Sequence, residues 1–327
     1  MANLARAVKS AGHECEVITM PFRFSPPDQV LRSMDVWETE DLNSLNGYGI
    51  DRLICMRFPT WYAKHDNKVC WILHQHRAVY DLWDTPFSGG LESTKEGIAL
   101  RDAITQRDTA SLRDCRKIFT NSKLVSDRLA RYNQLASKPL YHPPPIADKL
   151  YTDEPESYIL ATGRLESLKR VDLLIDAMQH VHQPVVALIT GEGGQKQVLQ
   201  RRIEEQGLGH KVRLLGKVSL EELLRLYAKC LGVFFGPYEE DMGYITLEAM
   251  LAAKPVITCT DSGGPLEFVV HRETGVVVTP DAYEVAAAID DLCSNRRRAA
   301  AWGNAGLHRY QELGISWDHV LESLLHE

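Results

Sequence analysis

Three absences in this 327-residue sequence exclude whole classes of protein. The seven cysteines are scattered and none lies in a CxxC pair, so no disulfide framework is indicated and reduced thiols in a cytoplasmic setting are expected. No apolar run approaches the roughly 20 residues of a membrane-spanning helix. No GxGxxG followed by an acidic residue is present, which argues against a dinucleotide-dependent dehydrogenase.

Length and charge bound the remaining classes. A chain of 327 residues exceeds the size at which one hydrophobic core usually stops growing, so two domains are expected. The net charge is −7, and the acidic residues are concentrated in the second half, which argues against a nucleic-acid partner. A basic run from Arg101 to Arg131 has two interpretations: a solvated helix face, or peripheral contact with the inner face of a membrane.

The first part of the chain alternates between helical and extended patterns. Such alternation predicts an α/β fold, in which a parallel sheet is covered by helices on both faces and binds ligands at the carboxyl ends of its strands. A loop rich in proline and polar residues separates the first two strands. The expected helices cover residues 1–12, 93–114 and 123–130, and the expected strands cover residues 13–20, 52–56, 68–73 and 116–120.

The stretch Pro143–Ser157 carries four prolines and no apolar period, so we place a domain boundary there. A second alternating unit follows, and two more helices close the chain after it. Its expected strands cover residues 158–162, 185–190, 212–215, 233–237 and 255–259, and its helices cover 170–181, 195–206, 220–229, 247–253 and 281–293, with the last helix of the chain at about 317–325.

One stretch of the second unit brings two carboxylates, a glycine and a helix start together. Glu240 is expected in a loop after a buried strand, and Gly243 permits close backbone approach. The amides of Tyr244, Ile245 and Thr246 are expected to be the unpaired N–H groups of a helix N-terminus, which form an anion site. Glu248, expected near the first turn of this helix, is placed to reach ribose or sugar hydroxyls.

A second phosphate signal lies at Gly163–Arg170, which ends a strand and opens a helix. Arg164 offers a planar fork of donors and Lys169 a movable point charge, a pair suited to a diphosphate leaving group. A salt bridge that flanks the helix is the alternative interpretation of these two side chains.

These motifs together resemble the retaining glycosyltransferases of family 4, which have the GT-B fold. The resemblance covers nearly the whole chain and rests on five segments in the family's order: GRLESLKRVDLLIDA (163–177), LLGKVSLEELLRLYAKC (214–230), EDMGYITLEAM (240–250), DSGGPLEFV (261–269) and ETGVVV (273–278).

The resemblance implies two Rossmann-like, doubly wound domains that face each other across a cleft. The implied domains are an acceptor-side domain at residues 1–145, a domain at 146–312 that binds a nucleotide sugar, and a final helix at 313–327 that crosses back to the first domain. Relatives begin with a strand and a glycine-rich loop before a helix like residues 1–12. We therefore expect the first domain to lack that strand and to be destabilised.

The resemblance also assigns roles to individual residues. It gives Arg164 and Lys169 the donor diphosphate, Glu240 the hydroxyls of the donor sugar, and Glu248 the ribose. The nucleotide is expected to contact further residues, namely Gly163, Gly216, Val218, Gly243, Tyr244, Ile245 and Thr246. The sequence contains no DxD triplet, which agrees with a transfer that needs neither a metal ion nor another cofactor.

A histidine of the first domain completes the implied site. His74 directly follows the strand at 68–73 and occupies the place of the family's active-site histidine, although His76 is close enough to compete for this assignment. A zinc site at the two histidines lacks a third ligand nearby in the sequence.

We therefore expect a retaining glycosyltransferase that moves a sugar from a nucleoside diphosphate sugar to a hydroxyl of a sugar or lipid-linked sugar acceptor. The synthesis of a polysaccharide, glycolipid or glycoconjugate is the expected context. Two alternatives stay open: a nucleotide-sugar epimerase, and a non-catalytic or inactive protein that binds nucleotide sugars.

Overall fold

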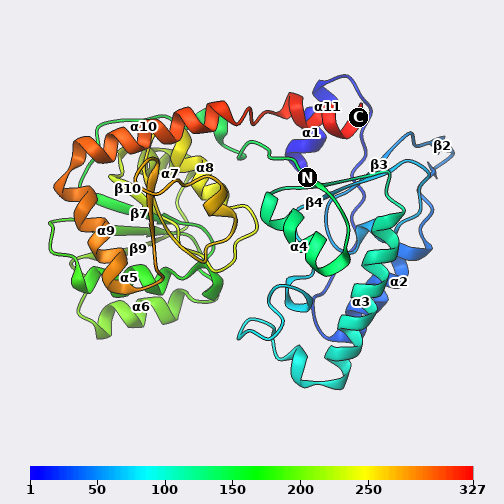
Figure 1. Cartoon of the computed structure of the whole chain (residues 1–327), viewed down its shortest axis with the longest axis horizontal. Coiled ribbons are helices and arrows are strands. Elements are labelled where there is room, and N and C mark those ends of the chain that lie inside the picture. Colours follow the sequence, from blue (N-terminus) through cyan, green and yellow to red (C-terminus); the bar gives the residue numbers. More distant parts are fainter. Residues whose placement is uncertain (327) are drawn as a thin grey trace. The chain divides into compact units, whose positions relative to one another are not determined.

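The computed structural model describes residues 1–326, which divide into two compact units (Figure 1). Unit 1 comprises Met1–His142 together with the segment that begins at Ser316, and unit 2 comprises Pro143–Ile315. Within the described residues, no helix combines the length and the apolar character needed to cross a membrane.

Unit 2 is built on a six-stranded sheet in which every pair of neighbours is parallel. The strand order is β12-β11-β10-β7-β8-β9, so the direction of winding reverses between β7 and β10. In such a sheet a crevice opens at the carboxyl ends of the two strands that flank the reversal. The elements are β7 (Tyr158–Thr162), α5 (Val171–His180), β8 (Val186–Thr190), α6 (Lys196–Glu205), β9 (Val212–Gly216), α7 (Leu220–Lys229), β10 (Gly232–Phe234), α8 (Tyr244–Leu251), β11 (Val256–Cys259), β12 (Gly275–Val278), α9 (Ala282–Ser294) and α10 (Arg296–Glu312).

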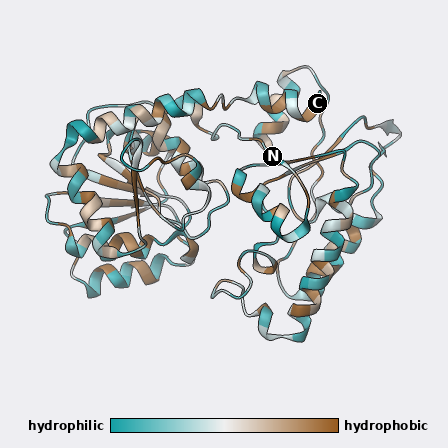
Figure 2. Cartoon of the chain, in the orientation of Figure 1, coloured by the Kyte–Doolittle hydropathy of each residue, from teal (hydrophilic) through white to brown (hydrophobic). Residues whose placement is uncertain are grey.

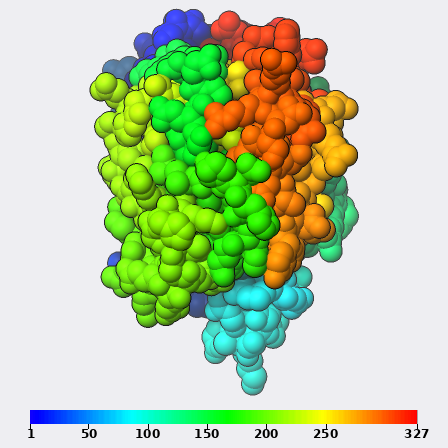
Figure 3. Space-filling view, turned by 90° about the vertical axis from the view of Figure 1, so that its left-hand side faces the viewer, coloured from blue at the N-terminus to red at the C-terminus, as the bar shows by residue number. Residues whose placement is uncertain are grey.

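Strand residues of unit 2 point alternately to two hydrophobic layers. Ile159 and Ala161 of β7 pack with α5, α6 and α9, whereas Tyr158 and Leu160 pack with α7 and α8. Because both of its faces are buried, the central strand β7 is an apolar run, and the strands of this unit are drawn largely brown in Figure 2. Figure 3 shows α9 beside α5 on the outer surface of this unit.

Unit 1 contains a four-stranded parallel sheet of order β3-β4-β5-β6. Helices α2, α3 and α4 cover one face, and α1 packs with α11, the last helix, on the other. The elements are α1 (Ala2–Ser10), α2 (Pro27–Thr39), β1 (Ser44–Leu45), β2 (Tyr48–Gly49), β3 (Leu53–Cys55), β4 (Lys68–Ile72), α3 (Lys95–Arg113), β5 (Lys117–Thr120), α4 (Lys123–Asn133), β6 (Lys138–Pro139) and α11 (Trp317–Leu325).

Two sequence predictions in unit 1 are wrong. Residues 13–20 form no strand: Ile18 and Met20 pack against the core, but their backbone joins no ladder, and an apolar run becomes a strand only where a neighbour pairs with it. The segment expected to be a loop contains α2, whose buried Val30, Met34 and Trp37 recur at helical spacing. Its signal was a proline in the first turn, a position that suits the start of a helix.

Candidate active site

Two loops of unit 2 carry the residues predicted to bind the phosphates and the sugar. Both loops lie where the winding of the sheet reverses. The loop after β7 contains Arg164 and Lys169, and the loop after β10 contains Glu240. Since β7 and β10 are hydrogen-bonded neighbours, their carboxyl ends bring the two loops side by side.

Lys169 and Glu240 form an ion pair between Nζ and Oε2, 71 positions apart in sequence. Both side chains are largely buried, and the Lys169 ammonium also lies 5.7 Å from the centre of the Phe235 ring. A cation and an anion thus share one partly desolvated place at the carboxyl end of the sheet, where each is available to an incoming polar ligand.

Arg170 holds the loop of Glu240 in place, and sequence reasoning missed it. Its guanidinium makes two hydrogen bonds to the carboxylate of Asp261, at 2.6 and 2.8 Å, and donates to the carbonyl oxygens of Gly236 and Pro237. Arg170 itself has a φ of 47°, a left-handed conformation. Both partners lay inside quoted motifs, but no spacing along the chain predicts that residues 91 positions apart will pair.

The backbone of Glu240 is fixed by the turn after β11. The Glu240 N–H donates to the carbonyl of Ser262 at 2.9 Å, and the Gly264 N–H donates to the carbonyl of Glu240 at 2.7 Å. Glu240 and Gly263 form an isolated parallel bridge. This arrangement orients the Glu240 side chain through its main chain, in addition to the ion pair with Lys169.

Gly243 starts α8 in a left-handed conformation, with φ of 84°. A side-chain carbon there would lie 2.9 Å from Phe235 and 3.0 Å from Pro265, so both the conformation and the space require glycine. The sequence predicted an unpaired amide at Thr246, and this is wrong. The Thr246 N–H donates a hydrogen bond of 3.0 Å to the Gly243 carbonyl, three residues earlier, within the first turn. Tyr244 and Ile245 are the first two residues of the helix.

Glu248 lies in the second turn of α8 rather than the first, because the helix begins three residues earlier than predicted. Its Oε2 accepts a hydrogen bond of 2.6 Å from the hydroxyl of Tyr227 on α7. Burial raises the pKa of the Glu248 carboxyl, and the Tyr227 hydrogen bond opposes that rise. Tyr227 is a second residue that the sequence did not single out, since only packing of α7 against α8 brings it here.

Glycines line the carboxyl edge of the sheet beside these side chains. Gly163 follows β7, Gly191 follows β8, and Gly216 is the last residue of β9. All three have positive φ. A side-chain carbon at Gly163 would lie 3.1 Å from Ile245, and one at Gly216 would lie 3.1 Å from Glu192. Positive φ and close neighbours therefore both favour glycine along this edge.

The remaining predicted residues differ in their surroundings. Arg164 is exposed and, within residues 1–326, its side chain makes no hydrogen bond or ion pair. Val218 is partly buried against the apolar layer formed by α7 and α8. Among the residues that the structure describes, no group of three or more histidine, cysteine or acidic side chains could hold a metal ion.

His74 belongs to unit 1, where it follows β4 and is half-buried, with Nδ1 3.0 Å from the carbonyl of Gln75. His76 is buried against the rings of Phe24 and Phe58, and burial lowers its pKa to about 4. The two histidines therefore have different environments: His74 retains access to solvent, whereas His76 is a neutral residue of the core.

Residues 145–309, half of the chain, match the family model described as glycosyl transferases group 1. Two curated relatives match parts of the chain. The human alpha-1,3/1,6-mannosyltransferase ALG2 is 28% identical over 185 residues, covering 52% of this chain and 44% of that protein. The GDP-mannose-dependent alpha-(1-6)-phosphatidylinositol monomannoside mannosyltransferase of Mycolicibacterium smegmatis is 33% identical over 162 residues, covering 46% and 42%. The chain spans less than half of the length of these relatives.

The structure is similar to a sucrose-phosphate synthase from Thermosynechococcus elongatus, with a TM-score of 0.72 over 99% of this chain and 91% of that one. The sequence identity is 19%, so the likeness concerns the fold. It extends over both units and agrees with the α/β, GT-B class predicted from the sequence.

Proposed function

This chain belongs to the glycosyl transferases group 1 family, and from that premise we propose that it is a retaining glycosyltransferase. It transfers a sugar from a nucleoside diphosphate sugar to a hydroxyl group of a sugar or lipid-linked sugar acceptor, in the synthesis of a polysaccharide, glycolipid or glycoconjugate. Both relatives are named as mannosyltransferases and one of them as GDP-mannose-dependent, so GDP-mannose is the first donor to test.

The observation that carries this proposal is the ion pair between Lys169 and Glu240 at the reversal of the sheet. A donor whose diphosphate lies against Lys169 places its sugar beside Glu240. Lys169 and Arg164 then neutralise the charge that develops on the leaving diphosphate, which is the electrostatic task that a divalent metal performs in other enzymes. Glu240 accepts hydrogen bonds from hydroxyls of the transferred sugar.

The nucleoside is held farther along the same edge. Glu248, with one oxygen already bonded to Tyr227, offers its other oxygen to the two hydroxyls of the ribose. Gly163 and Gly216 carry no side chain that would keep the nucleotide from their backbone, and Val218 supports the loop that faces the base.

Retention of configuration without a free carboxylate nucleophile assigns the proton to the leaving group. Glu240 is paired with Lys169 and is therefore a poor nucleophile. In the proposed step the bond from the anomeric carbon to the diphosphate oxygen breaks, the acceptor oxygen bonds to that carbon from the same face, and an oxygen of the departing diphosphate takes the acceptor proton. The family resemblance assigns His74 to the donor sugar, and this assignment stays a prediction.

The proposal is tested by incubating the chain with GDP-mannose, UDP-glucose and UDP-N-acetylglucosamine, with and without a panel of sugar acceptors, while nucleoside diphosphate release and products are followed. Release of nucleoside diphosphate with a new glycoside of retained configuration supports it. Binding measured by calorimetry with no turnover would favour the non-catalytic alternative. Release of a free epimerised sugar would favour the epimerase.

A further inference from the structure

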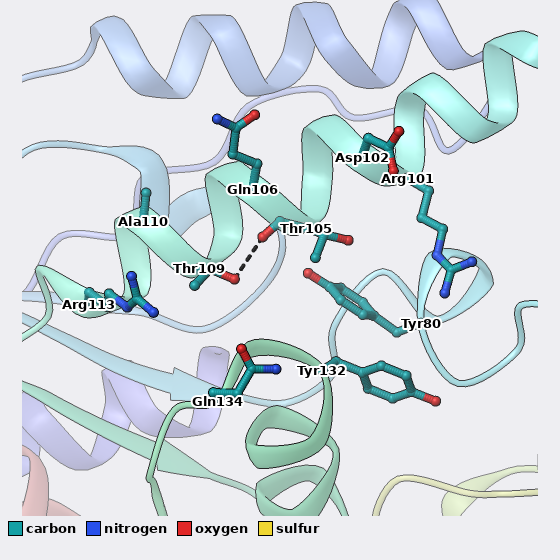
Figure 4. Close-up of a pocket in the computed structure, with 10 residues that line it drawn as sticks. All are labelled: Tyr80, Arg101, Asp102, Thr105, Gln106, Thr109, Ala110, Arg113, Tyr132 and Gln134. Atoms are coloured by element: carbon teal, nitrogen blue, oxygen red, sulfur yellow. Dashed lines mark hydrogen bonds between the residues drawn. The ribbon is translucent and has the colours of Figure 1, made fainter.

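A pocket of about 680 Å³ lies in unit 1 along α3 (Figure 4). Its lining comes from α3, from the end of α4 and from Tyr80, which follows β4. None of the residues assigned above to the donor site or to the histidine pair lines it. The basic run that the sequence analysis left with two interpretations supplies Arg101 and Arg113 to this pocket.

Hydrogen bonds on the buried side of α3 fix the walls of this pocket. Asp108, fully buried on the inner side of α3, accepts hydrogen bonds from Trp61 Nε1 at 2.8 Å, Tyr62 Oη at 2.6 Å and Tyr80 Oη at 2.8 Å. These bonds tie Tyr80 to α3.

A second set of bonds joins α4 to α3. Thr109 Oγ1 accepts from Asn133 Nδ2 at 2.8 Å, and it donates to the carbonyl of Thr105, as drawn in Figure 4. A pocket whose walls are already ordered lowers the entropic cost of binding a ligand.

Polar groups at the surface of the pocket are unused. Within residues 1–326, five side chains of the lining make no hydrogen bond or ion pair: Arg101, Asp102, Gln106, Arg113 and Gln134. The Asp102 carboxylate offsets one of the two arginines, so the charges of the lining sum to +1. The Arg101 guanidinium lies 4.4 Å from the centre of the Trp83 ring, which positions the cation and leaves its N–H edge available.

The two arginines stand far apart. Arg101 and Arg113 are twelve residues apart on one helix, about 18 Å along its axis. Figure 4 shows them at opposite ends of the pocket, with Tyr80 and Gln134 between them and Tyr132 on the side of Tyr80 that is away from α3. A small anion such as phosphate would need converging cations, so this arrangement suits an extended ligand with separate negative charges.

We propose that this pocket binds an acidic oligosaccharide, with its carboxylate or other anionic groups at Arg101 and Arg113. The amides of Gln106 and Gln134 donate to and accept from sugar hydroxyls between the two ends. Tyr132 is half-buried against Tyr80, with 5.4 Å between the ring centroids, and the Arg131 guanidinium lies 5.1 Å from the centre of the Tyr132 ring. A third arginine therefore stands next to a residue that lines the pocket, which adds positive charge near the proposed anionic ligand.

The test uses tetragalacturonic acid as the probe, with maltotetraose as a neutral sugar and tripolyphosphate as an anion without sugar. Calorimetry on the full chain measures each affinity in the absence of donor, so the result is independent of the proposed transferase activity. Arg101→Gln, Arg113→Gln and the double variant are compared with Arg201→Gln, an exposed arginine of α6 that serves as the matched control. Thermal unfolding checks that each variant is folded.

The expected result is that tetragalacturonic acid binds more tightly than either comparison ligand, and that each single variant loses about tenfold in affinity, which corresponds to one charge-assisted hydrogen bond. Arg201→Gln should bind like the parent. Unchanged affinity in the double variant would overturn the proposal, as would absence of binding in the parent or equal binding of maltotetraose or tripolyphosphate. Arginine-dependent binding to phosphatidylglycerol vesicles without oligosaccharide binding would assign the surface to a membrane instead.

Discussion

At the scale of single residues, the candidate site depends on pairs that the chain brings together from distant positions. Lys169 meets Glu240, and Tyr227 meets Glu248. In each pair, one oxygen of the glutamate is hydrogen-bonded to its protein partner, and the other oxygen can accept a hydrogen bond from a ligand. Single substitutions should therefore separate binding of the nucleotide from chemistry on the sugar.

Glu240→Gln should lower kcat by roughly a hundredfold or more, with little change in the Kd for nucleoside diphosphate, because its proposed partners belong to the transferred sugar. Lys169→Met should reduce both turnover and nucleotide affinity, since it faces the diphosphate throughout. Steady-state kinetics and calorimetry measure the two effects. Glu221→Gln, an exposed glutamate of α7, is the control. Near-parental turnover in either variant would remove that residue from the site.

Glu248→Gln should weaken the binding of nucleoside diphosphate and leave the binding of inorganic pyrophosphate unchanged, because the proposed partners of Glu248 are ribose hydroxyls. A loss of about tenfold corresponds to one hydrogen bond to a charged acceptor. Competition between the two ligands, measured by calorimetry, checks this. Equal losses for both ligands would indicate that the substitution disturbs the phosphate loops instead.

At the scale of elements, the position of α8 depends on a turn that only glycine can form. Gly243→Ala should lower the free energy of unfolding of unit 2 by about 2 kcal/mol, since the left-handed conformation alone costs a residue with a side chain roughly 1–2 kcal/mol and Phe235 and Pro265 lie too close. Gly209→Ala is the control, because it has open space and a φ outside the left-handed range. Denaturant unfolding of both variants decides the matter, and equal stability would contradict it.

In unit 1, two buried groups should give opposite dependences on pH. Burial raises the pKa of Asp108 to about 6, so the folded state gains a proton, and stability, as pH falls from about 6 toward 3.8. Burial lowers the pKa of His76 to about 4, so stability is lost as pH falls from 6.5 toward 4. Between pH 7 and 5 these contributions amount to a gain of about 1 kcal/mol and a loss of about 2 kcal/mol.

Between pH 7 and 5, the free energy of unfolding of Asp108→Asn should therefore fall by about 1 kcal/mol more than that of the parent. Over the same range, the free energy of unfolding of His76→Leu should fall by about 2 kcal/mol less than that of the parent. Denaturant unfolding followed by tryptophan fluorescence measures this, because five of the six tryptophans lie in unit 1: Trp37, Trp61, Trp71, Trp83 and Trp317. If the free energy of unfolding of both variants depends on pH as it does in the parent, the two groups do not titrate in this range.

At the scale of the whole molecule, one helix from the end of the described chain completes the core of the first unit. Val320, Leu321 and Leu324 of α11 pack in one cluster with Leu4 and Val8 of α1. The carbonyl of Leu324 also accepts a hydrogen bond of 2.5 Å from Arg52. The stability of unit 1 is therefore sensitive to residues that follow the whole of unit 2 in sequence.

Leu324→Ala should lower the free energy of unfolding of unit 1 by about 3 kcal/mol, the cost of emptying a fully buried leucine site. The affinity for nucleoside diphosphate should not change, because its proposed contacts belong to unit 2. Glu322→Ala, an exposed neighbour on the same helix, controls for the loss of a side chain. A drop in nucleotide affinity that matched the drop in stability would contradict this separation.

The sequence by itself determined the elements that local patterns encode. Leu220–Lys229 is a helix over the residues predicted, because a helix and its Ser219 cap depend on neighbours along the chain. Tyr158–Thr162 is a strand over the residues predicted from its apolar run. Glu240 stands in the loop expected for it. The family resemblance, carried by short motifs in order, also followed from the sequence.

Only the tertiary structure decided which residues meet. The apolar run at 13–20 satisfied a strand pattern, yet strand pairing is a non-local contact that no pattern within one segment reveals. The ion pair of Arg170 with Asp261 joins residues 91 positions apart. The hydrogen bond from Tyr227 to Glu248 joins residues 21 positions apart. Such contacts depend on the order of strands in the sheet and on helix packing, so the positioning of the site appears only when the chain is folded.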